Sequence, residues 1–210
     1  MLEIARSLNT YQSDIFYFAF AYALNKVMGK DKLFYIIEDG RGDVDVSDSI
    51  GVFMRLHPVW IRKNSDDPLE YAKSAVPQID KVMSYSDIAL TDVRKLRNIW
   101  PNVVLQFNNY LDPQGDQLSG LKVVVADDYD TSTEQLQDDG TAILKVIPLK
   151  PTDRSPFDIH VNINPMGDEY SVVASYSENQ SGEVVRDLIK EVDGYLLSLA
   201  ESVTHKQSRE

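Results

Sequence analysis

The sequence contains no cysteine. This absence excludes disulfide bonds, thiolate nucleophiles and zinc sites built from cysteine. It also fits a reducing compartment, so we expect a cytoplasmic protein. Basic residues are scarce as well, because 21 Lys and Arg face 33 Asp and Glu and leave a formal net charge of −12. Nucleic acids and anionic membranes both favour clustered basic side chains, so neither is expected as a partner.

Long apolar runs are also missing. The most apolar stretch, "IFYFAFAYAL", covers only Ile15 to Leu24, about half of what a membrane-spanning helix needs. It therefore predicts a buried helix. No basic stretch with a small-residue cleavage site precedes it, so we expect no signal peptide. With 43% hydrophobic residues in 210, the chain predicts a packed globular domain.

Several motifs that carry known chemistry are absent. There is no G-x-S-x-G, P-loop or G-x-G-x-x-G sequence, so a serine hydrolase elbow and a phosphate cradle lack support. The stretch "DVDVS" at 43–47 starts like a calcium-binding EF-hand loop. However, Asp48 occupies the position where that loop needs glycine, and Met54 occupies the position of its final glutamate. We therefore expect no metal site.

Histidine occurs only three times, at His57, His160 and His205. For the first two we expect a structural or solvated role, and the third lies near the chain end. His160 belongs to the alternating segment "DIHVNIN" (158–164). Because successive strand residues point to opposite faces, this alternation predicts one polar face and one apolar face. The polar residues of the segment are Asp158, His160, Asn162 and Asn164.

The apolar periodicity predicts an α/β fold, a mixed sheet with helices packed on it. Helices are expected at residues 13–28 with Ser13 as cap and Gly29 as stop, 68–76 after the cap Asp67, 91–98 and 182–202. Strands are expected at residues 32–37, 57–62, 103–107, 121–126, 143–149, 157–163 and 170–176. Pro77 should end or kink its helix. We expect one domain over 1–203 with an exposed acidic loop at 127–140, and a flexible tail over 204–210.

A series of segments in a fixed order is the most informative pattern in the sequence. These segments are "SDIFYFAFAYAL", "IIEDGRGD", "VSDSIGVFMRLHPVWI", "PNVVLQFNNYL" and "SPFDIHVNI". The series resembles the C-terminal lobe of condensation and epimerization domains of nonribosomal peptide synthetases, which act in secondary metabolism. In this family the third segment reads "TVGWFTxxYPV", and Gly51, Phe53, Pro58 and Val59 match it. "FNNYL" (107–111) matches "FNYLGQ" with one extra residue, and "EDGRGD" (38–43) matches "EGHGRE" loosely.

The resemblance covers roughly residues 10 to 202 and implies one lobe of a chloramphenicol acetyltransferase-like fold. In the family, two such lobes form a V around substrates that a carrier protein delivers as thioesters on its phosphopantetheine arm. No other cofactor is implied. The main catalytic histidine of the family lies in an HHxxxDG motif of the N-terminal lobe. This chain has no adjacent histidines, so the resemblance implies half of a catalytic domain that needs an N-terminal lobe and is inactive alone.

The resemblance also implies a set of site residues. Glu38 matches the catalytic glutamate of the epimerization branch, which exchanges the α-proton of the thioester, although counting back from Gly40 lands one residue earlier, on Ile37. Either Asn108 or Asn109 would present an amide to the substrate. Gly51 would line the substrate site within its motif.

Departures from both family branches keep two other functions open. Val52 replaces the tryptophan of the epimerization branch. The resulting "IGVF" is closer to the "IGxF" of amide-forming condensation domains. Met54 and Arg55, however, replace the asparagine that follows that motif in condensation domains. The resemblance therefore implies one of three functions: an epimerization-type lobe, a condensation-type lobe, or a non-catalytic lobe that binds a carrier protein. A basic group at Arg94, Lys95 and Arg97 could contact an acidic carrier, or could be a solvated helix face.

Overall fold

The computed structural model describes residues 1–29, 35–39, 55–85, 88–97, 102–108, 144–146, 157–166, 169–177 and 180–207. Its helices are α1 (Leu2–Leu8), α2 (Gln12–Met28), α3 (Pro68–Met83), α4 (Leu90–Arg97) and α5 (Gly182–Gln207). Its strands are β1 (Tyr35–Asp39), β2 (Arg55–Val59), β3 (Val103–Phe107), β4 (Leu144–Val146), β5 (Ile159–Met166) and β6 (Glu169–Tyr176). The strand expected at 121–126 and the acidic loop expected at 127–140 lie outside the described residues.

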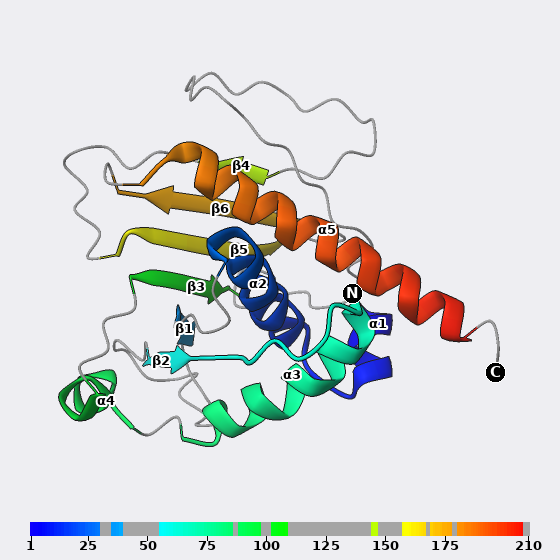
Figure 1. Cartoon of the computed structure of the whole chain (residues 1–210), viewed down its shortest axis with the longest axis horizontal. Coiled ribbons are helices and arrows are strands. Elements are labelled where there is room, and N and C mark those ends of the chain that lie inside the picture. Colours follow the sequence, from blue (N-terminus) through cyan, green and yellow to red (C-terminus); the bar gives the residue numbers. More distant parts are fainter. Residues whose placement is uncertain are drawn as a thin grey trace.

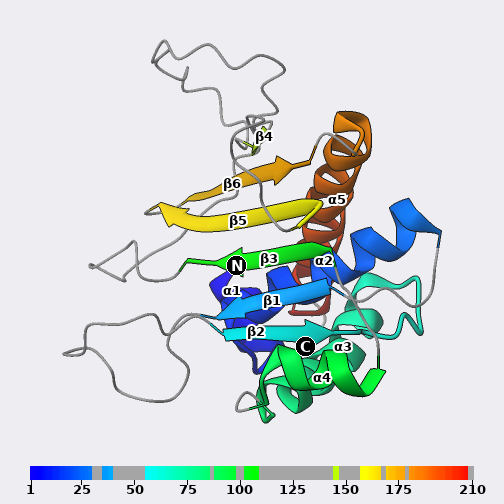
Figure 2. The same cartoon turned by 90° about the vertical axis from the view of Figure 1, so that its left-hand side faces the viewer.

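The strands form one six-stranded sheet in the order β2-β1-β3-β5-β6-β4. The pairs β1–β3, β3–β5 and β4–β6 are parallel, whereas β1–β2 and β5–β6 are antiparallel. In Figure 2 the arrowheads of β1, β3 and β5 accordingly point to the same side. The predicted mixed sheet is confirmed. The strand at 103–107 has its predicted bounds, and the other described strands differ from prediction by a few residues at their ends.

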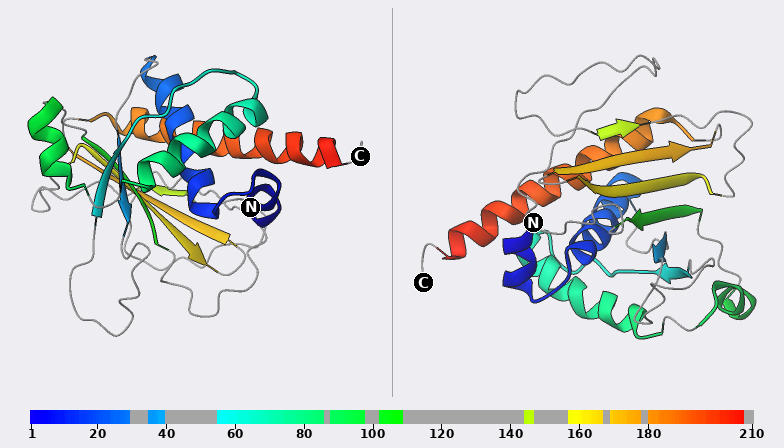
Figure 3. Two further views of the ribbon diagram at one scale, coloured as in Figure 1. Left: turned by 90° about the horizontal axis from the view of Figure 1, so that it is seen from below. Right: turned by 180° about the vertical axis from the view of Figure 1, so that it is seen from behind.

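Helices α2, α3 and α5 cover one face of the sheet (Figures 1 and 3). α2 is the central helix, and its apolar run is buried on most of its circumference, as the sequence predicted. Phe16, Phe18 and Phe20 are each at most 1% exposed, and burying such a side chain contributes about 1.5–3 kcal/mol. The Tyr195 ring of α5 and the Tyr71 ring of α3 pack edge-on with centroids 5.8 Å apart. The three helices therefore share one core above the sheet.

The start of α2 differs from the prediction. Helix α2 begins at Gln12 with Tyr11 as its N-cap, so Ser13 is not the cap. The cause is Asp14, whose carboxylate reaches back to accept a hydrogen bond of 3.1 Å from the Tyr11 backbone N–H. The other end of α2 agrees with the prediction. Gly29 follows the helix with a φ of 61°, a left-handed conformation that glycine adopts at little cost.

Helix α3 begins as predicted but does not end at Pro77. The Asp67 side chain accepts a 2.8 Å hydrogen bond from the Glu70 backbone N–H, and Pro68 occupies the first turn. The helix then continues through Pro77 to Met83. Pro77 lies on the exposed side of α3, where water can bond the carbonyl group that the proline leaves without a donor. Pro77 therefore does not end the helix, and the other predicted outcome, a kink at Pro77, stays a prediction.

Helix α5 continues to Gln207, beyond the end expected at residue 202, so residues 204–207 are helical rather than part of a flexible tail. Val203 explains the extension because it is only 5% exposed and continues the apolar stripe of the helix. Helix α1, which the sequence patterns did not predict, packs against α5 and contributes Ile4 and Ala5 to the same core. Within the described residues, no helix is long and apolar enough to span a membrane.

Candidate functional site

The carboxyl ends of β1, β3 and β5 meet at one edge of the sheet because the three strands are parallel. Backbone pairing aligns Glu38 of β1 with Gln106 of β3, and Gln106 with Asn162 of β5. Two residues further along, Asn108 follows β3, and Asn164 lies near the end of β5. Ligands of open α/β sheets commonly bind at this edge. We therefore take it as the candidate site.

The two faces of strand β5 differ in chemistry. Ile37, Leu105 and Val161 are aligned across the strands, are at most 1% exposed, and belong to the core beneath the helices. The residues of opposite parity in β5, His160 and Asn162, are half-buried polar side chains. This alternation confirms the predicted polar face. Figure 3 shows that α2, α3 and α5 lie together on the opposite, apolar face.

Asn108 is the most constrained polar residue at this edge. Its backbone N–H donates a 2.8 Å hydrogen bond to the Ile163 carbonyl. Its side-chain Nδ2 donates a 2.7 Å hydrogen bond to Oδ1 of Asn164. The residue is only 6% exposed, and within the described part of the chain no group donates a hydrogen bond to its buried Oδ1. A buried acceptor without a hydrogen bond costs free energy, so this atom favours a ligand that brings a donor.

The opposite end of the same face is held by a polar network. The Asp158 carboxylate accepts hydrogen bonds from Asn102 Nδ2 at 2.9 Å and from Ser177 Oγ at 3.2 Å. These bonds tie the beginnings of β3 and β5 to the end of β6. Both carboxylate oxygens of Asp158 are engaged in these bonds, which indicates a structural role for this residue.

His160 lies on the polar face beside the Phe157 ring, with the ring centroids 6.4 Å apart. Burial lowers the pKa of the His160 imidazole below its usual value of 6.5. The side chain is therefore mainly neutral at neutral pH. His57 is buried in β2 opposite Ile37, consistent with the structural role expected for it.

The structure places some of the predicted site residues. Glu38 lies within β1, where its backbone pairs with that of Gln106, one strand from Asn108. Gly51 and Asn109 lie outside the described residues. In the predicted basic group, Lys95 is on α4 and pairs with Asp92 at 3.3 Å. No sequence motif singles out Asn164 as a site residue, although the alternation of "DIHVNIN" places it on the polar face.

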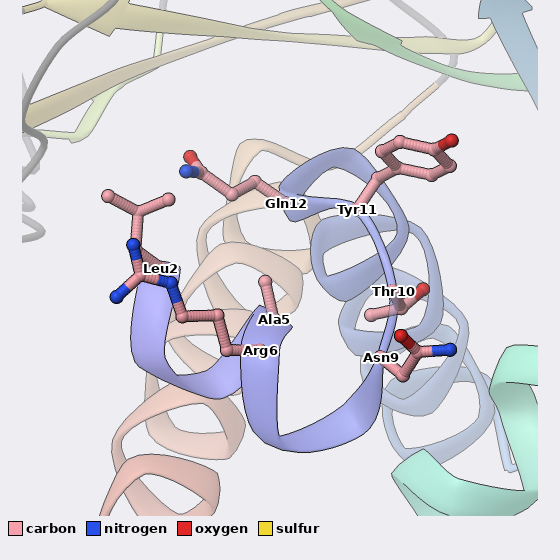
Figure 4. A pocket seen from close by; sticks show the side chains of 7 residues that line it. All are labelled: Leu2, Ala5, Arg6, Asn9, Thr10, Tyr11 and Gln12. Atoms are coloured by element: carbon pink, nitrogen blue, oxygen red, sulfur yellow. The ribbon is translucent and has the colours of Figure 1, made fainter.

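A pocket of about 530 Å³ lies in the elbow between α1 and α2 (Figure 4). Its lining residues are Leu2, Ala5, Arg6, Asn9, Thr10, Tyr11 and Gln12. The elbow is fixed by Asn9, which has a φ of 51°, and by the Thr10 hydroxyl, which donates a 2.7 Å hydrogen bond to the Asp14 carboxylate. The Tyr170 hydroxyl of β6 donates to the Gln12 side chain, so the elbow is joined to the sheet. Within the described residues, no group of three or more potential metal ligands is present.

Comparison with known proteins identifies the fold. No protein-family model matches the chain, and no curated protein sequence matches it. Solved structures do match. The epimerization domain of the third module of tyrocidine synthetase B aligns with a TM-score of 0.61 and 14% identity, over 96% of this chain and 44% of that one. The first condensation domain of the CDA synthetase aligns with a TM-score of 0.59 and 10% identity, over 94% of this chain and 41% of that one.

A third match has the same extent. The condensation domain of the Monacolin K polyketide synthase aligns with a TM-score of 0.59 and 12% identity, over 96% of this chain and 43% of that one. The chain therefore has the fold of one lobe of condensation and epimerization domains, the chloramphenicol acetyltransferase-like fold that the motif series implied. It spans less than half the length of the structures it matches. At these identities, the likeness defines the fold alone.

Proposed function

We propose that the chain is the C-terminal lobe of a peptide synthetase condensation-superfamily domain of the epimerization type. It would act in the cytoplasm on aminoacyl or peptidyl thioesters that a carrier protein holds on its phosphopantetheine arm. The shared fold and the order of the sequence motifs support this proposal. The observation that carries it is the parallel alignment that brings Glu38 and Asn108 to the same sheet edge.

The burial pattern supports Glu38 rather than its neighbour as the glutamate of the motif. Ile37, the position reached by counting back from Gly40, is wholly buried in the core with Leu105. A residue in that row faces the helices and cannot meet a substrate. Because neighbouring strand positions alternate between faces, the register favours position 38 for a group that acts on a substrate.

Epimerization requires two acid–base groups, one on each side of the α-carbon. In this proposal the Glu38 carboxylate removes the α-proton of the thioester, and the histidine of the N-terminal lobe returns a proton from the opposite side. A cleft that excludes water would raise the pKa of the Glu38 carboxyl group toward neutral pH, which suits a group that exchanges protons. The chain alone would lack one of the two groups, so we propose that it has no turnover without the second lobe.

For substrate binding we propose Asn108 as the asparagine of the motif, since β5 holds it at the sheet edge through both its backbone and its side chain. We also propose substrate-binding roles for Asn109 and Gly51, on the basis of the motif resemblance alone. The proposed partners are the N-terminal lobe within the same protein and a carrier protein. We propose no nucleic-acid or membrane partner, given the net charge of −12.

Two other functions are favoured by particular residues. Val52 in "SIGVF" favours an amide-forming condensation lobe, in which an acceptor amine attacks the donor thioester. The combined departures at Val52, Met54 and Arg55 favour a lobe that binds a carrier protein without catalysis. Neither reading accounts for an acidic residue at position 38 as directly as epimerization does.

One experiment separates the three functions. A carrier protein loaded with an L-aminoacyl thioester is incubated in D₂O with the complete protein that contains this chain. Deuterium at the α-carbon supports the epimerization lobe. Formation of an amide with an added aminoacyl carrier, without deuterium uptake, would replace it with the condensation lobe. Carrier binding without either reaction would leave only the binding lobe.

A further inference from the structure

The Asn108 side chain is locked in one orientation by β5. Its backbone N–H is bonded to the Ile163 carbonyl at 2.8 Å, and its Nδ2 is bonded to Asn164 Oδ1 at 2.7 Å. Asn164 follows Ile163 in the same strand, so a single segment of β5 fixes both the backbone and the side chain of Asn108. With only 6% of the residue exposed, the amide has little freedom to turn. The position of its second polar atom is therefore set in advance of any binding event.

The lock determines which polar atom remains for a ligand. A side-chain amide has a donor end, Nδ2, and an acceptor end, Oδ1. Asn164 accepts from one of the two N–H groups of Nδ2, and within the described residues Oδ1 is buried with no hydrogen-bond donor. A ligand that satisfies this atom must bring an N–H or O–H group. A developing enolate oxygen is excluded as the partner of Oδ1, because a carbonyl oxygen would repel it rather than stabilise it.

The geometry of the edge indicates which donor fits. Glu38 is one strand from Asn108 and two residues back along the register, which places their Cα atoms about 8 Å apart. A single substrate α-carbon with its substituents can occupy that span. If the proton on this carbon is directed to position 38, the neighbouring donor on the same carbon is the α-nitrogen. In a peptidyl thioester, this donor is an amide N–H.

We propose that Asn164 is a positioning residue that fixes the Asn108 amide so that its Oδ1 accepts a hydrogen bond from the α-nitrogen of the tethered substrate. The proposal rests on the proposed function and adds which partner donates and which accepts the hydrogen bond to the substrate. It requires that Asn164 act as an acceptor. Aspartate can replace an acceptor of this shape, whereas leucine cannot.

The test measures binding by the complete protein that contains this chain. The probes are the pantetheine thioester of N-acetyl-L-alanine and its analogue from 2-acetoxypropanoic acid, in which an ester oxygen replaces the amide N–H. The variants are Asn164→Leu and Asn164→Asp. Ser175→Val is the matched control, since Ser175 is a half-buried polar residue of the same sheet face on β6. Circular dichroism of each variant confirms folding.

The wild-type protein should bind the amide probe about tenfold more tightly than the ester probe, as expected for one hydrogen bond. Asn164→Leu should lose this preference without weakening the ester probe, whereas Asn164→Asp and Ser175→Val should retain it. Because the readout is a ratio between two probes, a general loss of stability would not reproduce this result.

Three results would overturn the inference while leaving the proposed function in place: equal binding of both probes by the wild type, an unchanged preference in Asn164→Leu, or a loss of preference in Asn164→Asp. The last would mean that Asn164 donates rather than accepts. Binding of neither probe by the wild type would remove the proposed function as well.

Discussion

The hydroxyl group of Tyr71 in α3 donates a hydrogen bond of 3.2 Å to the backbone carbonyl of Phe18 in α2. The rings of the same two residues meet edge-on with centroids 6.5 Å apart. Tyr71 is completely buried. The contact therefore joins α3 to the central helix α2 at a completely buried point.

Replacing Tyr71 with phenylalanine should lower the free energy of unfolding by about 1–2 kcal/mol. The substitution removes the hydroxyl but keeps the ring, so the cost is that of one buried hydrogen bond. Urea denaturation measures the change through the midpoint at constant slope. Tyr11→Phe is the control, because Tyr11 is 78% exposed. Equal midpoints for the two variants would contradict the role of the contact.

Replacing Pro77 with alanine should raise the free energy of unfolding by about 1–3 kcal/mol. Pro77 is exposed within α3, so alanine restores a helical N–H without disturbing the core. Thermal and urea unfolding of the two proteins would measure the gain. A less stable variant would mean that α3 depends on the proline, contrary to its exposed position.

Replacing His160 with glutamine should reduce the loss of stability at mildly acidic pH. Burial lowers the pKa of His160 in the folded protein below its usual value of 6.5. The unfolded chain therefore binds the proton more readily, and folding stability falls as the pH drops through about 6.5 toward the folded pKa. The contribution is fully present above that pH.

The measurement compares urea midpoints of the wild type and His160→Gln at pH 7.5 and 5.5. The wild type should lose more stability between the two conditions than the variant does. An identical loss in both proteins would assign the acid sensitivity to other groups.

The sequence predicted features that depend on neighbouring residues. The strand at 103–107 was predicted with its observed bounds, and the alternation of 158–164 gave the two faces of β5. The helix start at Asp67 was also predicted, because a cap and its partner lie three residues apart. The sequence did not decide between an end and a kink at Pro77, since whether a proline can be tolerated depends on which side of the helix meets water.

The central contact of the candidate site could not be predicted in this way. Asn108 and Asn164 are 56 residues apart in the chain. Their pairing depends on the parallel alignment of β3 with β5, which a single sequence does not encode in any local pattern. The motifs had drawn attention to Asn108 but not to Asn164, because Asn164 acts through Asn108 and belongs to none of the motif segments quoted for substrate binding.

The most direct test of the account is solvent deuterium exchange at the α-carbon of a carrier-bound aminoacyl thioester, with Glu38→Gln in the complete protein. Glutamine keeps the shape of glutamate but cannot accept the α-proton, so exchange should fall to the uncatalysed rate. Asp39→Asn, which removes the neighbouring carboxylate on the same strand, should retain exchange. Undiminished exchange in Glu38→Gln would remove Glu38 from the mechanism and contradict the proposed epimerization role.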